Sequence, residues 1–178
     1  MADDRKEPWL NYLALTTVLL AVCATLSTFK GGGYSTRSLL SQTQASDQWA
    51  FYQAKSIKGY IYDMNRGQLQ LDLKALGPKP PADLKADYEK KIEDYGNKIA
   101  TYDTEKKQIE AEARKLEGAR EEAKKHSQGF GLAVIFLQIS ILLCSIAALM
   151  KKKPLWLLGS ALGLVGIIYF FNGFFLFF

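Results

Sequence analysis

The sequence is poor in the side chains that enzymes use most. It holds one histidine and two cysteines among 178 residues. The histidine, His126, lies beside Lys124 and Lys125, and no serine or cysteine forms a recognisable nucleophile pattern with it. Cys23 and Cys144 lie in apolar stretches without neighbouring ligands, as small packing residues do. No phosphate loop or metal-ligand spacing occurs, so the sequence predicts neither an enzyme nor a cofactor.

Charge is missing from three long apolar runs, residues 9–29, 130–150 and 155–178. Each run has roughly 20 residues or more, enough for a helix to cross the hydrocarbon core of a bilayer. We therefore expect three transmembrane helices with the lipid bilayer as a partner, the first an uncleaved anchor because it exceeds the apolar length of a signal peptide. Their lack of ionisable residues argues against charge-coupled transport.

The remaining charge is nearly balanced and spread along the chain. Lysine and arginine number 23, aspartate and glutamate 18, and the formal net charge is +5. Binding to nucleic acid usually requires basic residues clustered on one face. The sequence predicts no nucleic-acid partner, and no motif identifies a small-molecule substrate.

The short link at 151–154 gives the predicted orientation. It contains Lys151, Lys152 and Lys153, the densest positive cluster in the chain. Short loops rich in lysine stay in the cytoplasm, whereas long segments are translocated largely regardless of charge. We expect this link and the polar N-terminus (residues 1–8) to be cytoplasmic, and residues 30–129 to be periplasmic in a bacterial inner membrane.

Residues 30–129 are predicted to form a long antiparallel helical hairpin outside the bilayer, resembling a coiled coil. The glycines at 31–33 are expected to break the first helix, because each costs about 1 kcal/mol in a helix. The sequence GPKPP at 77–81 predicts the turn between arms at about 37–76 and 82–126. The fold class is therefore an all-α membrane protein with three transmembrane helices.

Each arm has an apolar face with helical spacing. In the second arm, tyrosine, isoleucine, leucine and alanine recur every seven residues at Tyr88, Tyr95, Tyr102, Ile109, Leu116 and Ala123. In the first arm, one face carries Leu39, Ala50, Ala54, Ile57, Ile61 and Met64. We expect these two faces to pack against each other.

Aromatic and lysine side chains near the middle of the first arm need a different explanation. Phe51 and Tyr62 are expected on the far side of the helix. Two interpretations remain open: these aromatics cover a little surface, or their face packs against another subunit. The candidate interface residues are Trp49, Phe51, Tyr52, Lys55, Lys58 and Tyr62.

Residues 45–58, ASDQWAFYQAKSIK, carry a resemblance to a known family. Together with one N-terminal run and two C-terminal runs separated by a basic link, this stretch resembles a family of bacterial membrane proteins described as a domain of unknown function. The resemblance covers nearly the whole chain. It implies a bacterial inner-membrane protein and supplies no activity.

Small and polar residues mark possible contacts inside the membrane. Gly159, Gly163 and Gly166 permit close helix approach, within one subunit or between subunits. Gln138 and Asn172 are the most polar groups in the apolar runs, and each could bond to a neighbouring helix or line a pore. The sequence thus predicts a non-catalytic, homo-oligomerising scaffold or an accessory subunit of a membrane assembly. The alternative is an oligomeric pore or channel.

Overall fold

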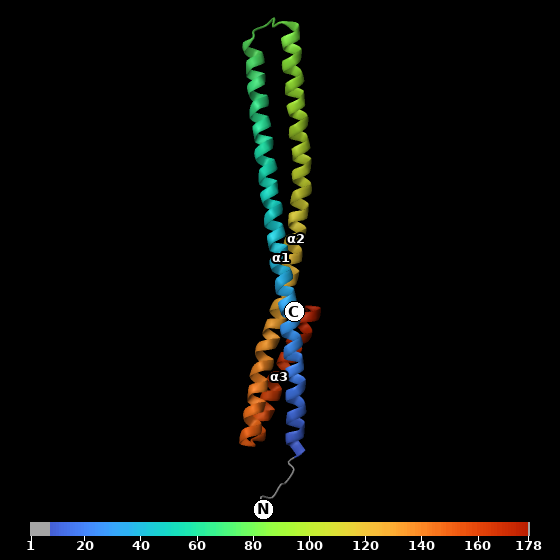
Figure 1. Ribbon diagram of the computed structural model, residues 1–178, viewed down its shortest axis with the longest axis vertical. Coiled ribbons are helices and arrows are strands. Elements are labelled where there is room, and N and C mark those ends of the chain that lie inside the picture. The colour runs from blue at the N-terminus through green and yellow to red at the C-terminus, as the bar shows by residue number, and fades with distance from the viewer. Residues whose placement is uncertain (1–7, 178) are drawn as a thin grey trace, which may run out of the picture. The chain divides into compact units, whose positions relative to one another are not determined.

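The computed structural model describes residues 8–177, and within this range the chain forms three helices and no strand. They are α1 (Pro8–Ala75), α2 (Ala82–Met150) and α3 (Lys153–Phe175), shown in Figure 1. Each helix contains a stretch long and apolar enough to cross a membrane. Residues 1–7 of the predicted polar N-terminus, and residue 178 of the third apolar run, lie outside the described residues.

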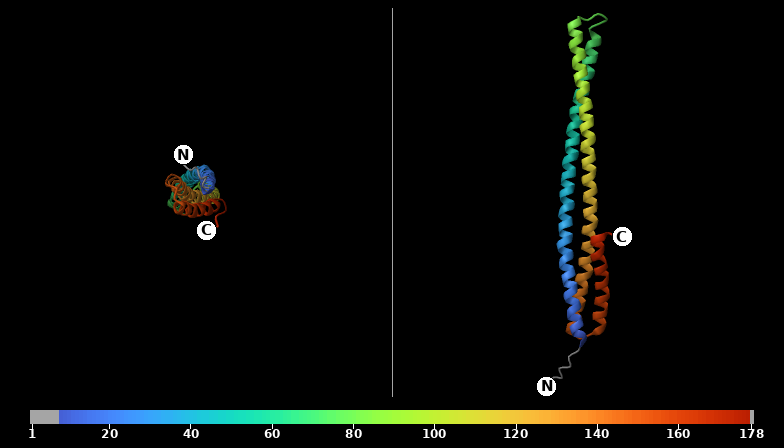
Figure 2. Two further views of the ribbon diagram at one scale, coloured as in Figure 1. Left: turned by 90° about the horizontal axis from the view of Figure 1, so that it is seen from below. Right: turned by 90° about the vertical axis from the view of Figure 1, so that its right-hand side faces the viewer.

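The helices divide between two compact units. The first unit comprises α3 together with residues 8–40 of α1 and 119–150 of α2, and the second comprises residues 41–118. Within each unit the helices lie side by side in Figure 1 and in the right-hand view of Figure 2. We call the second unit the hairpin, because its two helical segments run in opposite directions and are joined by residues 76–81.

The glycine triplet at 31–33 does not break the first helix, contrary to the prediction. α1 continues through all three glycines. Gly31 packs closely against α2, because a Cβ atom there would lie 3.0 Å from Cβ of Phe130, whereas Gly32 and Gly33 have open space around them. The Ser127 hydroxyl also donates a hydrogen bond to the Gly31 carbonyl at 3.1 Å. At Gly31 these tertiary contacts offset the low helix propensity of glycine.

Two short connections end the long helices. Residues 76–81 join α1 to α2, where the sequence predicts a turn, and Gly77 there has a φ of +81°. At the other connection, Lys151 takes a left-handed conformation, and the Lys152 amide donates to the Ala147 carbonyl at 3.2 Å. This bonding satisfies carbonyls at the end of α2. α3 then begins at Lys153, just before Pro154 rather than after it.

The hairpin packs through the predicted face of α2 but not through the predicted face of α1. In α2, Ile109 and Ala113 are buried. In α1, by contrast, Ile57 is 59%, Ile61 49% and Met64 72% exposed, so the prediction for this arm is wrong. The α2 face also carries tyrosine and charged groups that need polar partners. A face of α1 rich in aromatic and polar residues meets them better than an aliphatic one.

In the first unit, three helices enclose a core of small and branched side chains. The main cluster consists of Leu20, Ala24, Ala133, Leu137 and Cys144. Such small residues allow helices in a membrane to approach closely.

Candidate assembly surfaces

Trp49 fixes one end of the contact between the two hairpin helices. Its indole Nε1 donates a hydrogen bond of 2.9 Å to Glu117 on α2. Its ring also meets Tyr52 edge to face, with centroids 5.6 Å apart. Trp49 and Tyr52, both predicted interface residues, are thus engaged within the hairpin.

Lys55 reaches across the hairpin into a cage of opposite charge and aromatic rings. Its Nζ lies 2.6 Å from a Glu105 oxygen, and the two side chains form an ion pair between α1 and α2. The same Nζ lies 5.2 Å from the ring centroid of Tyr102 and 5.3 Å from that of Phe51. Only 18% of the Lys55 side chain is exposed, so this lysine faces α2 rather than the far side of α1.

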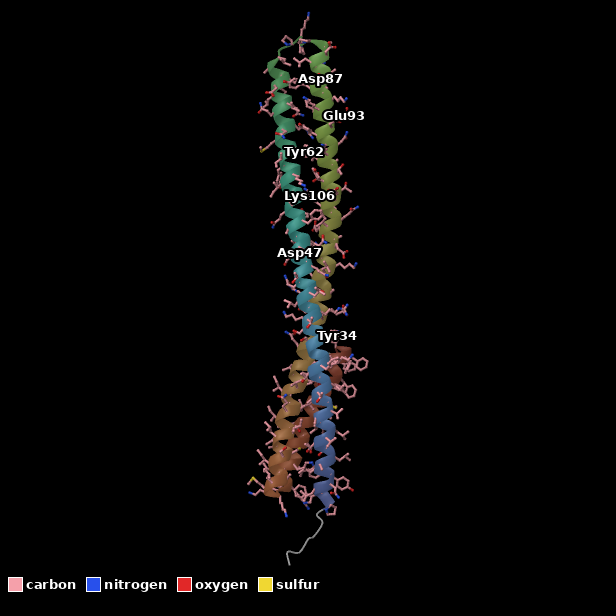
Figure 3. All side chains as sticks on the ribbon, in the orientation of Figure 1. Tyr34, Asp47, Tyr62, Asp87, Glu93 and Lys106 are labelled. Atoms are coloured by element: carbon pink, nitrogen blue, oxygen red, sulfur yellow. The ribbon has the colours of Figure 1, made fainter. Side chains whose placement is uncertain are left out.

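Tyr62 also points toward α2, which corrects the predicted orientation on the far side (Figure 3). Its ring centroid lies 5.3 Å from that of Tyr95 and 5.8 Å from that of Tyr102. Lys98 donates a hydrogen bond of 3.2 Å to the Tyr62 hydroxyl, and this bond raises the pKa of Lys98. A hydrogen bond to Asp103 likewise raises the pKa of Lys106, which lies on the α2 face toward α1.

Two of the six predicted interface residues remain on the surface. Phe51 is 51% exposed, and Lys58 is exposed as well. The aliphatic face of α1 lies beside them. The sequence predicts that this face packs against α2, but it is exposed instead. The seven-residue spacing identifies this face as a packing surface, but spacing alone does not say which surface covers it.

Replacing Trp49 with phenylalanine tests the Trp49–Glu117 bond. Trp49→Phe keeps an aromatic ring but leaves the Glu117 carboxylate without its indole donor, and we expect a loss of about 1–2 kcal/mol in hairpin stability. Hydrogen exchange of the backbone amides around residues 45–52 in the full-length protein measures this loss. Glu117→Gln keeps an oxygen acceptor and should exchange close to wild type; equal effects of the two changes would contradict the assigned bond.

The predicted membrane glycines pack inside one chain. A Cβ atom on Gly159 would lie 3.2 Å from Cys144 Sγ. On Gly163 it would lie 2.8 Å from a methyl carbon of Leu20, and on Gly166 2.8 Å from Cγ of Leu137. These glycines therefore hold α3 close to α1 and α2.

The polar groups in the apolar helices differ in their surroundings. The Ser140 hydroxyl is buried and donates a 2.6 Å hydrogen bond to the Gly159 carbonyl. Asn172 is also buried, and its carbonyl accepts from the Leu176 amide at 2.8 Å. Gln138 is exposed on the surface of the first unit. Of the two predicted amides, only Gln138 is available to something outside the chain.

His126 belongs to a contact that the sequence does not reveal. It was expected at the end of its own helix, but α2 continues to Met150. Its Nδ1 lies 2.8 Å from the Gly173 carbonyl in the last turn of α3, and Tyr34 stacks on its ring at 4.5 Å. The imidazole therefore complements the carboxyl end of α3. The two partners lie 47 positions apart in the sequence, so no local pattern could predict this contact.

Among residues 8–177, no three histidine, cysteine, aspartate or glutamate side chains gather in a way that could hold a metal ion. A family model described as "Domain of unknown function (DUF4337)" matches residues 9–176. The chain belongs to the DUF4337 family. No curated protein and no solved structure matches it. The DUF4337 match covers α2, α3 and all of α1 except Pro8, and it brings no activity with it.

Proposed function

We propose that this DUF4337 protein is a non-catalytic integral membrane protein that works as a homo-oligomerising scaffold or as an accessory subunit of a membrane assembly. The main support for this proposal is the exposed aliphatic face on the α1 segment of the hairpin. Ile57, Met64 and Leu71 are each more than half exposed on the α1 segment of the hairpin. Soluble surfaces rarely leave contiguous apolar patches uncovered, so a partner surface is the natural function of this face.

In this proposal residues 9–29, 130–150 and 155–178 cross a bacterial inner membrane, and residues 30–129 lie outside it. The lysines at 151–153 and the N-terminus are cytoplasmic, and the hairpin is periplasmic. The positive charge of the short α2–α3 connection supports this orientation. The apolar stretches of all three helices support the membrane location.

Gln138 supports assembly within the membrane as well. An exposed amide in an apolar helix would face hydrocarbon in a single copy, where it lacks hydrogen-bonding partners. A neighbouring subunit would supply them. The same exposure favours the second candidate function, an oligomeric pore in which Gln138 lines the opening. The buried position of Asn172 supports packing rather than a pore lining for that residue.

The mass of the full-length protein in mild detergent and in lipid nanodiscs tests the scaffold. We expect a defined particle that contains either at least two copies of the chain or one copy together with co-purifying subunits. A strictly monomeric particle in both environments would contradict the proposal. Conductance in liposomes tests the pore: a current that Gln138→Leu removes would favour the channel over the scaffold.

A further inference from the structure

We propose that the occupant of the aliphatic face is the same face of a second copy, packed parallel and in register. This inference rests on the proposed function and identifies its partner. We define the outer stripe as the residues on α1 that face away from α2 at alternating steps of four and three. They are Ala50, Ala54, Ile57, Ile61, Met64, Gln68 and Leu71.

The spacing of the outer stripe is that of a helix that packs along another helix. Steps of four and three keep side chains on one seam over three heptads. All seven residues are exposed in the single chain. The residues of α1 that meet α2, among them Trp49 and Tyr62, lie on the opposite side of the helix. The segment therefore carries two packing faces, and the second helix of the hairpin covers only one.

The outward face of α2 offers no comparable seam. It is lined with polar and charged side chains such as Lys90, Asp94, Asn97 and Lys107, all exposed. Such a face is typical of a helix in contact with water. The contrast places the self-association surface on α1 alone, and it makes α2 an internal control for any experiment on the stripe.

The residues beside the outer stripe fit a parallel copy. In a parallel pair, the residue before every second seam position, here 54, 61 and 68, faces a residue five positions further along the partner helix. This pairing sets Gln53 against Lys58, Tyr60 against Asn65 and Gly67 against Asp72, and no like charges meet. Copies that span the same membrane in the same orientation would present identical stripes in the same direction, which favours this symmetric contact.

Gln68 is the one polar residue of the outer stripe. In the single chain its amide donates a 2.8 Å hydrogen bond to Asp72. A single amide on an otherwise apolar seam specifies register, because it is satisfied best by the equivalent amide of the partner. A lipid surface would be a poorer occupant, since helices that bind anionic lipid carry lysine and arginine along both flanks. Here Lys58 and Asp72 flank the stripe with opposite charges.

Cysteine cross-linking of the full-length protein in membranes tests both partner and register. Ala54→Cys and Leu71→Cys lie toward opposite ends of the stripe, so each pairs with itself only in a parallel, in-register contact. Asn97→Cys on the outward face of α2 is the matched control. Cysteines whose Cα atoms are more than about 7 Å apart cannot bridge. On mild oxidation we expect each stripe variant to give about tenfold more covalent dimer than the control, a contrast set by this limit on reach.

The outcomes separate this inference from the proposed function. Equal cross-linking at 54, 71 and 97, or cross-links only to a protein of different mass, would overturn the parallel self-contact. The detergent particle mass is read independently, so an oligomer without stripe cross-links overturns only this inference. Ile61→Asp should shift the particle toward monomer, whereas Asn97→Asp should not. A further outcome is that the wild-type protein and Ile61→Asp are both monomeric and only the variant loses its binding to vesicles. Lipid would then be the occupant of the outer stripe, and the self-contact would be refuted.

Discussion

Gly129→Leu is expected to disrupt the three-helix unit. A Cβ atom at position 129 would lie 2.9 Å from Cα and 3.1 Å from the backbone nitrogen of Gly173. A flexible side chain could move aside, but a backbone can yield only if α3 shifts away from α2. Overpacking usually lowers the free energy of unfolding by about 1–3 kcal/mol and occasionally by more. Because the clash here is with backbone, we expect a loss of about 3 kcal/mol or above. Denaturation of the full-length protein in detergent, followed by helical circular dichroism, measures the loss.

Gly131→Leu provides the control two residues further along the same helix. A Cβ atom there has no neighbour within 4 Å, and the position is exposed. Because leucine is the better helix former by about 0.5–1 kcal/mol, this variant should be as stable as wild type or slightly more so. Comparable losses in the two variants would mean that the Gly129–Gly173 approach does not hold the helices together.

Tyr62→Ala is expected to open the middle of the hairpin. The change removes two ring contacts, to Tyr95 and Tyr102, and the acceptor of the Lys98 hydrogen bond. Each aromatic pair contributes about 0.5–1.5 kcal/mol beyond its burial, so we expect a local loss of about 2 kcal/mol. Backbone amides near residues 58–66 and 95–102 should then exchange hydrogen roughly thirtyfold faster where they open by local unfolding.

Tyr60→Ala is the matched control for this change. Tyr60 lies two residues away on the same helix and is 69% exposed. Its removal should leave the exchange of the α2 amides unchanged, because exposed positions usually shift stability by less than about 0.5 kcal/mol. If Tyr60→Ala loosened α2 as much as Tyr62→Ala, the aromatic contacts would not be what joins the two helices.

Local chemistry predicts the elements of this protein well. Uncharged apolar runs of membrane length, and the proline-rich turn before Ala82, are signals contained within short stretches of chain. Each depends on the nearby sequence alone. The membrane-length apolar segments and the turn follow from them, but the continuity of α1 past residue 29 and of α2 past residue 126 does not.

Choices between two faces of one helix are harder to predict. α1 has an aliphatic face and a face with aromatic and polar groups, and both repeat with helical spacing. Hydrophobicity favours burying Ile57 and Ile61, but the α2 face presents tyrosines, Glu105 and Lys106. These groups select polar aromatic partners on α1. The glycines at 31–33 pose the same difficulty, because the contact of Gly31 with Phe130 is remote in sequence.

The close fit around the α3 glycines also has a consequence for the order of folding during synthesis. Leu20 near the start of the chain fills the space opposite Gly163, and Leu137 fills the space opposite Gly166. The first two apolar segments therefore leave the ribosome before the surface that completes their core exists. Contacts of such long sequence separation form slowly. Until α3 is made, the side chains of α1 and α2 that pack against its glycines have no partner, so the first unit closes only after α3 has been synthesised.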